Sequence, residues 1–181
     1  MTQRNGLLGI LNSILRPRKR PAAPARSATS APPATSAPPQ SRSGPAATVE
    51  VPPPAADALR ITYAPDRDGD PDAGEIVWTW VPYSENDGRG KDRPVLVIAR
   101  QTADRVYAVR LTSKAHDGDR DFLAIGTGEW DARGRPSWID IDQLYSVHRD
   151  GMRREASALD LDRFVRVADA LHRRYGWSAG G

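Results

Sequence analysis

An uninterrupted apolar run is the feature that most constrains how this chain can fold. Residues 94–99 read PVLVIA and are flanked by an arginine on each side. Short apolar runs of this kind are typical of strands that are buried on both faces. Residues 75–81, which read EIVWTWV, alternate side chains of unlike character and predict a second strand. The two runs predict a strand pair around which the following chain is built.

The segment between these two strands predicts a long, functional loop. It spans about a dozen residues with three charges of each sign, two glycines and one proline. Such a segment is too long for a tight hairpin and too polar to be buried. Arg93 lies where this loop enters the buried strand, an unusual position for a guanidinium.

The first third of the chain differs in composition from the rest. Residues 1–60 hold 11 of the 16 prolines and 12 alanines, so they bury too little apolar surface to offset the entropy of ordering. We predict a disordered, basic Ala/Pro/Ser-rich tail over residues 1–60 and one domain over residues 61–181. Apolar residues at helical spacing indicate that residues 6–16 can form a short amphipathic helix. This segment is either a membrane-contact or partner-docking peptide or part of a disordered leader.

Charge divides along the same boundary. Residues 1–60 carry 8 Lys/Arg and 2 Asp/Glu (8 − 2 = +6), which leaves 18 and 21 (18 − 21 = −3) for the remainder. Nucleic-acid binding by the domain would therefore depend on a local basic groove. The chain has no cysteine, which excludes disulfides and thiolate metal sites and fits a cytoplasmic protein. Residues 65–75 are rich in aspartate, but we interpret them as a solvated linker and expect neither a metal nor a cofactor.

Further strands and one helix follow. The sequence predicts strands over residues 105–111, 122–126 and 137–147, the last divided into two near Gln143. Short strands without intervening helices predict a small closed or nearly closed barrel. A final helix is predicted between an N-cap at Asp160 and a stop at Gly176. Its predicted apolar stripe consists of Leu161, Phe164, Val165, Ala168, Leu171 and Tyr175.

Four segments occur in an order that resembles a known family. They read GEIVWTWVP, RPVLVIAR, RLTSKAH and SWIDIDQLYSVHRDGM, and lie within residues 74–177. Together they resemble the PemK/MazF family, the toxins of bacterial type II toxin–antitoxin pairs. The resemblance implies a mainly β fold, an SH3-like antiparallel barrel with a C-terminal helix, usually paired as a homodimer. It also implies metal-independent cleavage of single-stranded RNA such as mRNA, through attack of the ribose 2'-hydroxyl, and a cognate antitoxin whose acidic tail covers the same groove.

The resemblance also implies site residues. The catalytic pair of the family falls on Arg93 and Thr112, with Ser113 as a helper. A guanidinium fork and a hydroxyl can hold a phosphate and stabilise added negative charge, because the nucleophile is part of the RNA itself. His116, outside the motif, is a candidate proton shuttle. The candidates for RNA contact are Tyr83, Arg89, Lys91, Trp80 and Trp130.

Structural roles remain open as alternatives for the same residues. Arg93 can form a surface salt bridge with Asp92 or Glu85, and Thr112 is a common type of residue at a strand end. The tryptophans can belong to the core, which we expect most of Trp78 and Trp138.

Two other functions are compatible with this fold. One is a non-catalytic toxin that poisons DNA gyrase through its C-terminal helix, and the other is an inactive SH3-like binding module tethered by its basic leader. The presence of both Arg93 and Thr112 favours the endoribonuclease.

Overall fold

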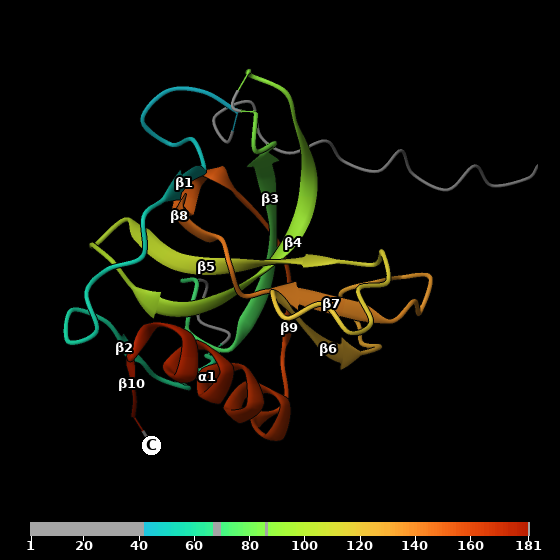
Figure 1. Cartoon of the computed structure of the whole chain (residues 1–181). Coiled ribbons are helices and arrows are strands. Elements are labelled where there is room, and N and C mark those ends of the chain that lie inside the picture. The colour runs from blue at the N-terminus through green and yellow to red at the C-terminus, as the bar shows by residue number, and fades with distance from the viewer. Residues whose placement is uncertain (1–41, 67–69, 86, 181) are drawn as a thin grey trace, which may run out of the picture. The chain divides into compact units, whose positions relative to one another are not determined.

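The computed structural model describes residues 42–66, 70–85 and 87–180. These residues form a curled antiparallel sheet with one C-terminal helix, α1, on its outer side (Figure 1). The predicted helix at residues 6–16 lies outside the described residues. In the part of the chain that the structure describes, no helix is both long and apolar enough to cross a membrane.

The larger sheet contains eight strands in the order β1-β8-β5-β4-β3-β9, with β7 pairing to both β5 and β6. The remaining two strands, β2 and β10, form a small parallel pair. The fold is therefore mainly β, a half-barrel with a C-terminal helix. The elements are β1 (Val49–Val51), β2 (Arg60–Ile61), β3 (Glu75–Pro82), β4 (Gly90–Arg100), β5 (Arg105–Thr112), β6 (Phe122–Gly126), β7 (Ser137–Asp140), β8 (Leu144–His148), β9 (Met152–Ala158), α1 (Leu161–Tyr175) and β10 (Ser178–Ala179).

The apolar run of β4 supplies both cores of the protein. Successive side chains of a strand point to opposite faces. Leu96 and Ile98 accordingly join a core that includes the buried residues of α1. Val95 and Val97 join a second core, formed with residues of β3, β5, β8 and β9. Burial on both faces explains why this strand is a continuous apolar run.

The loop before β4 is shorter than predicted. β4 begins at Gly90 rather than at residue 94, and Gly90 pairs with Pro82 across the hairpin. The loop therefore comprises only residues 83–89. The charges of residues 91–93 suggested a loop, but a strand tolerates them because its backbone groups are paired, while Lys91 is exposed and Asp92 and Arg93 are only partly buried.

Ordered structure also begins earlier than residue 61. Val49 of β1 pairs with Ser146 of β8, and the hydroxyl of buried Thr48 forms a hydrogen bond of 2.7 Å with the hydroxyl of Thr79. Residues 42–60 therefore do not behave as a disordered tail. A strand of three residues can add to the edge of an existing sheet although the surrounding composition is rich in alanine and proline.

Helix α1 begins and ends where the sequence predicts. The side chain of Asp160 accepts a hydrogen bond from the backbone N–H of Arg163, at 3.0 Å. Gly176 follows the helix with a φ of 75°, a left-handed conformation that favours glycine.

The buried face of α1 differs from the predicted stripe. Leu161 and Val165 are 52% and 47% exposed, whereas Val167 and Ala170 are buried. The predicted stripe was therefore wrong at two positions and missed two others. Apolar residues of α1 lie on more than one overlapping face, because Phe164 is followed by the apolar residues Val167 and Ala170 three and six positions later. Only tertiary packing decides which of these faces is buried.

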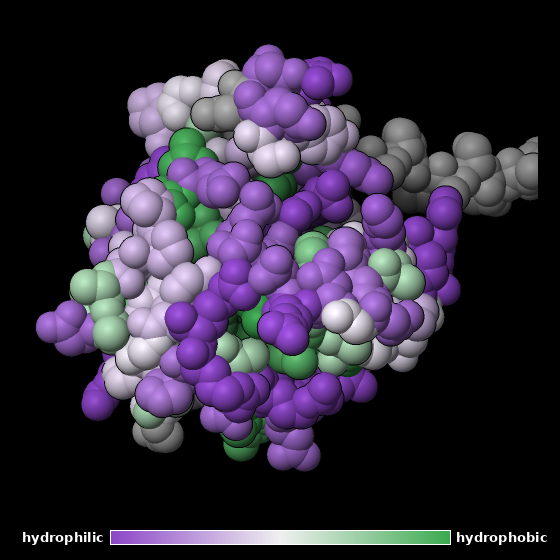
Figure 2. All heavy atoms as spheres, in the orientation of Figure 1, coloured by the Kyte–Doolittle hydropathy of each residue, from purple (hydrophilic) through white to green (hydrophobic). Residues whose placement is uncertain are grey.

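The tryptophans divide differently from the prediction. Trp130 and Trp177 are buried, at 5% and 0% exposure, whereas Trp78 and Trp138 are only partly buried. Figure 2 shows one face of the molecule as mostly hydrophilic, with apolar residues in small patches.

Candidate functional site

A groove opens where β4 and β5 separate. The two strands pair from Arg100 as far as Val95, which lies opposite Arg110. Beyond this pair β4 continues along β3, and β5 pairs with β7 instead. The same antiparallel register, continued by two residues, would place Arg93 opposite Thr112. The separation of the strands leaves these two side chains on opposite walls of a groove of about 400 Å³.

The groove brings together five of the nine site residues that the sequence predicted. Their neighbours in its lining include charged side chains of both signs. The predicted residues in the lining are Arg93, Thr112, Ser113, Lys91 and Trp130. The other charged residues in the lining are Asp92, Lys114, Asp131 and Arg135.

Arg93 is a partly buried cation. Burial lowers its pKa, and the nearby charge of Arg110 lowers it further, although the Tyr83 and Tyr145 phenols act in the opposite direction. A guanidinium nevertheless stays protonated in proteins. An anion that entered the groove would relieve both the desolvation and the repulsion between the two arginines, so this position is suited to binding a phosphate.

Thr112 presents a hydroxyl at the end of β5. Its Oγ1 accepts a hydrogen bond of 3.2 Å from the backbone N–H of Lys114. A hydroxyl that accepts one hydrogen bond still has its own proton to donate. Ser113 follows it and is exposed. The end of β5 therefore offers hydroxyl donors across the groove from Arg93.

A second groove, also of about 400 Å³, lies on another side of Arg93. Tyr83 and Arg89 line it together with Arg93. Trp80 lines a third groove of about 520 Å³, again with Tyr83 and Arg89. The guanidinium carbon of Arg42 lies 4.6 Å from the centroid of the Trp80 ring. The predicted RNA-contact residues thus fall along three grooves that are linked by shared residues.

Trp130 is placed differently from the other predicted RNA contacts. Its side chain is 5% exposed, and its Nε1–H donates to the hydroxyl of Ser137 at 3.0 Å. Stacking on a base requires an accessible ring face, and the buried ring of Trp130 offers little of one. The ring supports the wall of the groove from the core side.

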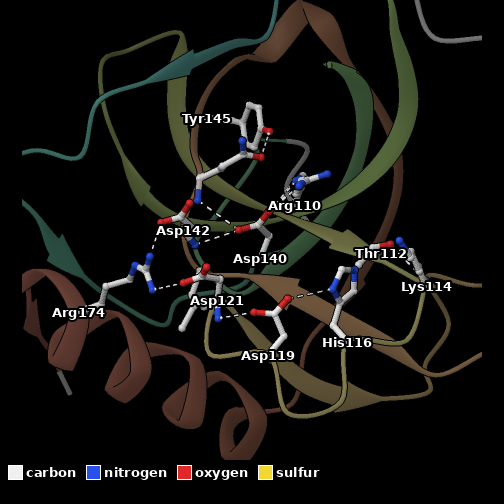
Figure 3. A network of polar contacts seen from close by, with 12 residues as sticks. Arg110, Thr112, Lys114, His116, Asp119, Asp121, Asp140, Asp142, Tyr145 and Arg174 are labelled. Carbon is white, nitrogen blue, oxygen red and sulfur yellow. Dashed lines mark hydrogen bonds and ion pairs between the residues drawn. The ribbon is translucent and has the colours of Figure 1, made fainter. Parts of the chain in front are cut away.

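His116 follows Thr112 by four residues and packs against an aromatic ring. Its ring stacks on Phe122 with centroids 3.5 Å apart, and its Nδ1 is 3.4 Å from a carboxylate oxygen of Asp119 (Figure 3). It contributes to the lining of neither of the grooves that Arg93 lines. The role of His116 as a proton shuttle stays a prediction.

Arg110 is a site residue that the sequence did not single out. It lines the second groove beside Arg93 and forms an ion pair of 2.6 Å with Asp140. Alternation along residues 105–111 places its side chain on the same face as that of Thr112, and this was the available signal. Among the described residues, no group of three or more histidine, aspartate or glutamate side chains is placed to hold a metal ion.

A protein-family match covers the segment of the chain that contains the first groove. The model of the family described as the PemK-like, MazF-like toxin of type II toxin–antitoxin systems matches residues 72–174. The chain belongs to this family. The matched segment contains Arg93, Thr112 and both walls of the first groove, so this groove is part of the PemK/MazF domain. β1, β2 and β10 lie outside the match.

Solved structures of similar proteins include several toxins. An endoribonuclease in complex with its cognate antitoxin from a mycobacterial species is 19% identical, with 59% of this chain and 96% of that chain covered and a TM-score of 0.45. A MazE–MazF structure from Deinococcus radiodurans is 23% identical, with coverage of 60% and 97% and a TM-score of 0.43. The Mycobacterium tuberculosis toxin MazF-mt6 is 15% identical, with coverage of 56% and 98% and a TM-score of 0.41. No curated protein matches the chain.

Proposed function

We propose that this PemK/MazF protein is an endoribonuclease toxin that cuts single-stranded RNA without a metal ion. The observation that carries the proposal is the groove between β4 and β5, which has Arg93 on one wall and Thr112 on the other. A cation and a hydroxyl donor that face the same space can hold one phosphate between them.

The reaction needs little from the protein beyond this pair. The ribose 2'-oxygen forms a bond to the adjacent phosphorus, and the bond from phosphorus to the 5'-oxygen of the next nucleotide breaks. The 2'-hydroxyl loses a proton, the departing 5'-oxygen gains one, and the products are a 2',3'-cyclic phosphate and a 5'-hydroxyl. Arg93 and Thr112 stabilise the extra charge on the phosphoryl oxygens in the transition state.

The RNA strand would extend from the first groove into the other two. Tyr83 and Trp80 are aromatic side chains with partial exposure, which suits them to stack on unpaired bases. Arg89 and Lys91 are exposed and would contact phosphates. Trp130, by contrast, would act by supporting the groove.

The partners follow from the same proposal. A cognate antitoxin would place an acidic segment over these grooves, because the cations that bind RNA phosphates also bind carboxylates. We further propose that the chain forms a homodimer and acts in the cytoplasm, as the family resemblance implies.

The test is cleavage of a long RNA in the presence of EDTA, with the 5' ends of the products mapped. Arg93→Ala and Thr112→Ala should each lower the cleavage rate by roughly a hundredfold or more. The double variant should lose little beyond the worse single variant, because the two groups act on the same phosphate. Arg100→Ala serves as the control, since Arg100 lies at the opposite end of β4 and forms an exposed ion pair with Asp72.

Unchanged cleavage in a folded Arg93→Ala or Thr112→Ala protein would remove that residue from the site. A wild-type protein that leaves RNA intact but inhibits DNA gyrase would overturn the proposal as a whole.

A further inference from the structure

Arg110 is a second guanidinium beside the proposed catalytic pair. It precedes Thr112 by two residues on β5, so the two side chains leave the same face of the strand about 6.6 Å apart. The side chain of Arg110 is 23% exposed, which means that part of it reaches solvent. The step between successive phosphates of an extended RNA strand is comparable to this spacing.

A buried carboxylate fixes the position of Arg110. The Nε–H of Arg110 donates to Oδ2 of Asp140 at 2.9 Å, and its Nη2 lies 2.6 Å from the same oxygen (Figure 3). The side chain of Asp140 is only 3% exposed. Its other oxygen, Oδ1, accepts hydrogen bonds from the backbone N–H groups of Asp142 and Gln143 at 2.9 and 3.2 Å. The carboxylate therefore cannot swing away, and the guanidinium is held in one orientation.

This arrangement leaves donors of Arg110 available for a ligand. A guanidinium has five N–H donors, and Asp140 occupies only those on one edge, at Nε and Nη2. The side chain of Arg110 is partly exposed, so the donors on its other edge can reach a ligand. Arg110 lines the second groove with Arg93, Tyr83 and Tyr145, and the hydroxyl of Tyr145 donates to Oε1 of Gln143 at 2.9 Å.

The position of Arg110 relative to the first groove decides which phosphate it can reach. Arg93 lines both grooves, whereas Thr112 lines the first and Arg110 lines the second. A phosphate held between Arg93 and Thr112 would thus lie on one side of Arg93, and Arg110 on the other. Arg110 is placed for the neighbouring phosphate rather than for the one that reacts.

We propose that Arg110 binds the RNA phosphate next to the scissile one, and that Asp140 is the positioning residue that orients Arg110 for this contact. The proposal rests on the proposed ribonuclease function and adds a second phosphate position to it. Because the contact exists before and during the reaction, its loss raises KM and leaves kcat nearly unchanged.

The experiment measures binding of a single-stranded DNA oligonucleotide, which lacks the 2'-hydroxyl and is not cleaved by this chemistry, as a function of salt. For single strands the slope of log K against log salt changes by about 0.7 for each phosphate contact. The full-length double variant Arg110→Met with Asp140→Asn should weaken binding by roughly tenfold or more at low salt and reduce the slope by about 0.7. The double variant avoids leaving a buried aspartate without its partner, and a thermal melt checks that it folds.

Two further proteins complete the design. Arg110→Lys keeps the charge opposite Asp140 but lacks the planar fork, so it should raise KM for RNA and leave kcat within about twofold of wild type. Arg100→Met is the matched control, because Arg100 also pairs with an aspartate but lies at the far end of β4; it should change neither slope nor KM.

The outcomes separate the two proposals. If wild type binds and cleaves nucleic acid but the double variant keeps the wild-type slope and Arg110→Lys keeps the wild-type KM, the role of Arg110 is refuted and the ribonuclease proposal stands. A loss in kcat with unchanged KM in the Arg110→Lys protein would also refute the proposed role of Arg110, because Arg110 would then act on the scissile phosphate. If wild type neither binds nor cleaves, both proposals fail.

Discussion

The same substitution at two nearby positions of α1 tests which face of the helix is buried. Val167 is 1% exposed and Val165 is 47% exposed. Replacing either valine by alanine removes two methyl groups and raises intrinsic helix propensity by the same amount, about 0.5 kcal/mol. Any difference between the two variants therefore reports burial.

The magnitude follows from the area that each valine buries. Two buried carbons are worth about 1.6 kcal/mol in transfer free energy, and the residual cavity adds to this. Val167→Ala should therefore lower the free energy of unfolding by about 1.5 to 2.5 kcal/mol after the gain in helix propensity. At Val165 roughly half of the transfer term applies, and the propensity gain offsets most of it. Val165→Ala should thus cost between about 0 and 0.5 kcal/mol.

Urea unfolding at fixed protein concentration provides the measurement, with the midpoints compared at constant m. The difference between the variants should be at least about 1 kcal/mol, or roughly 3 °C in Tm. Equal losses at the two positions would show that the helix is rotated from the orientation described above. A Val165→Ala variant of unchanged stability but altered sedimentation would show instead that Leu161 and Val165, which line an apolar groove of about 350 Å³, belong to a contact between copies of the chain.

Two further predictions concern single side chains. Burial raises the pKa of Tyr145 to about 12, whereas the pKa in the unfolded chain is about 10. The contribution of the protonated Tyr145 to the free energy of unfolding is therefore complete below pH 10 and falls by roughly 1.4 kcal/mol per pH unit as the pH rises toward 12. Tyr145→Phe should flatten this decline in unfolding curves taken over the same pH range. Asp160→Ala should cost about 0.5 to 2 kcal/mol in urea unfolding because it removes the N-cap of α1, whereas Asp169→Ala, in the middle of the same helix, should cost less; equal effects would show that the cap contributes little.

Local sequence signals were sufficient for most elements of the fold. Alternation identified β3 and β5, and the apolar run identified the core of β4, because these patterns depend only on neighbouring residues. The same holds for the ends of α1, where Asp160 and Gly176 act through their own side chain and backbone. The family motifs led to Arg93 and Thr112 for a similar reason, since each lies in a short recognisable segment.

Contacts between distant segments could not be predicted in this way. The pair of Arg110 and Asp140 joins residues thirty positions apart, and nothing near either residue in the sequence indicates the other. The groove itself depends on β5 leaving β4 for β7 after Arg110, which is a property of strand pairing and not of composition. The burial of Trp130 likewise depends on how its loop folds back on the core.

The N-terminal segment is where composition misled most, and Arg105 explains why this segment is ordered. Its Nη2 donates to the carbonyl oxygens of Pro45 and Ala47 at 2.7 and 2.9 Å, and its Nη1 donates to the carbonyl and hydroxyl oxygens of Ser146 at 3.1 and 2.9 Å. One guanidinium thus ties the chain before β1 to β8. This contact is independent of the Ala/Pro content of the segment.

Arg105→Met should therefore release β1 without unfolding the rest of the domain. Hydrogen bonds from a charged donor contribute about 1.5 to 3 kcal/mol each in mutational series, but water can replace the donor at the exposed Pro45 carbonyl, so we expect a net loss of about 1 to 3 kcal/mol. Amide exchange of residues 49–51 should accelerate, while that of β3 and β4 stays near the wild-type rate. Arg100→Met, which removes an exposed ion pair, should change neither the stability of the domain nor the amide exchange of residues 49–51. Wild-type protection of residues 49–51 in the Arg105→Met protein would show that strand pairing with β8 alone orders this segment.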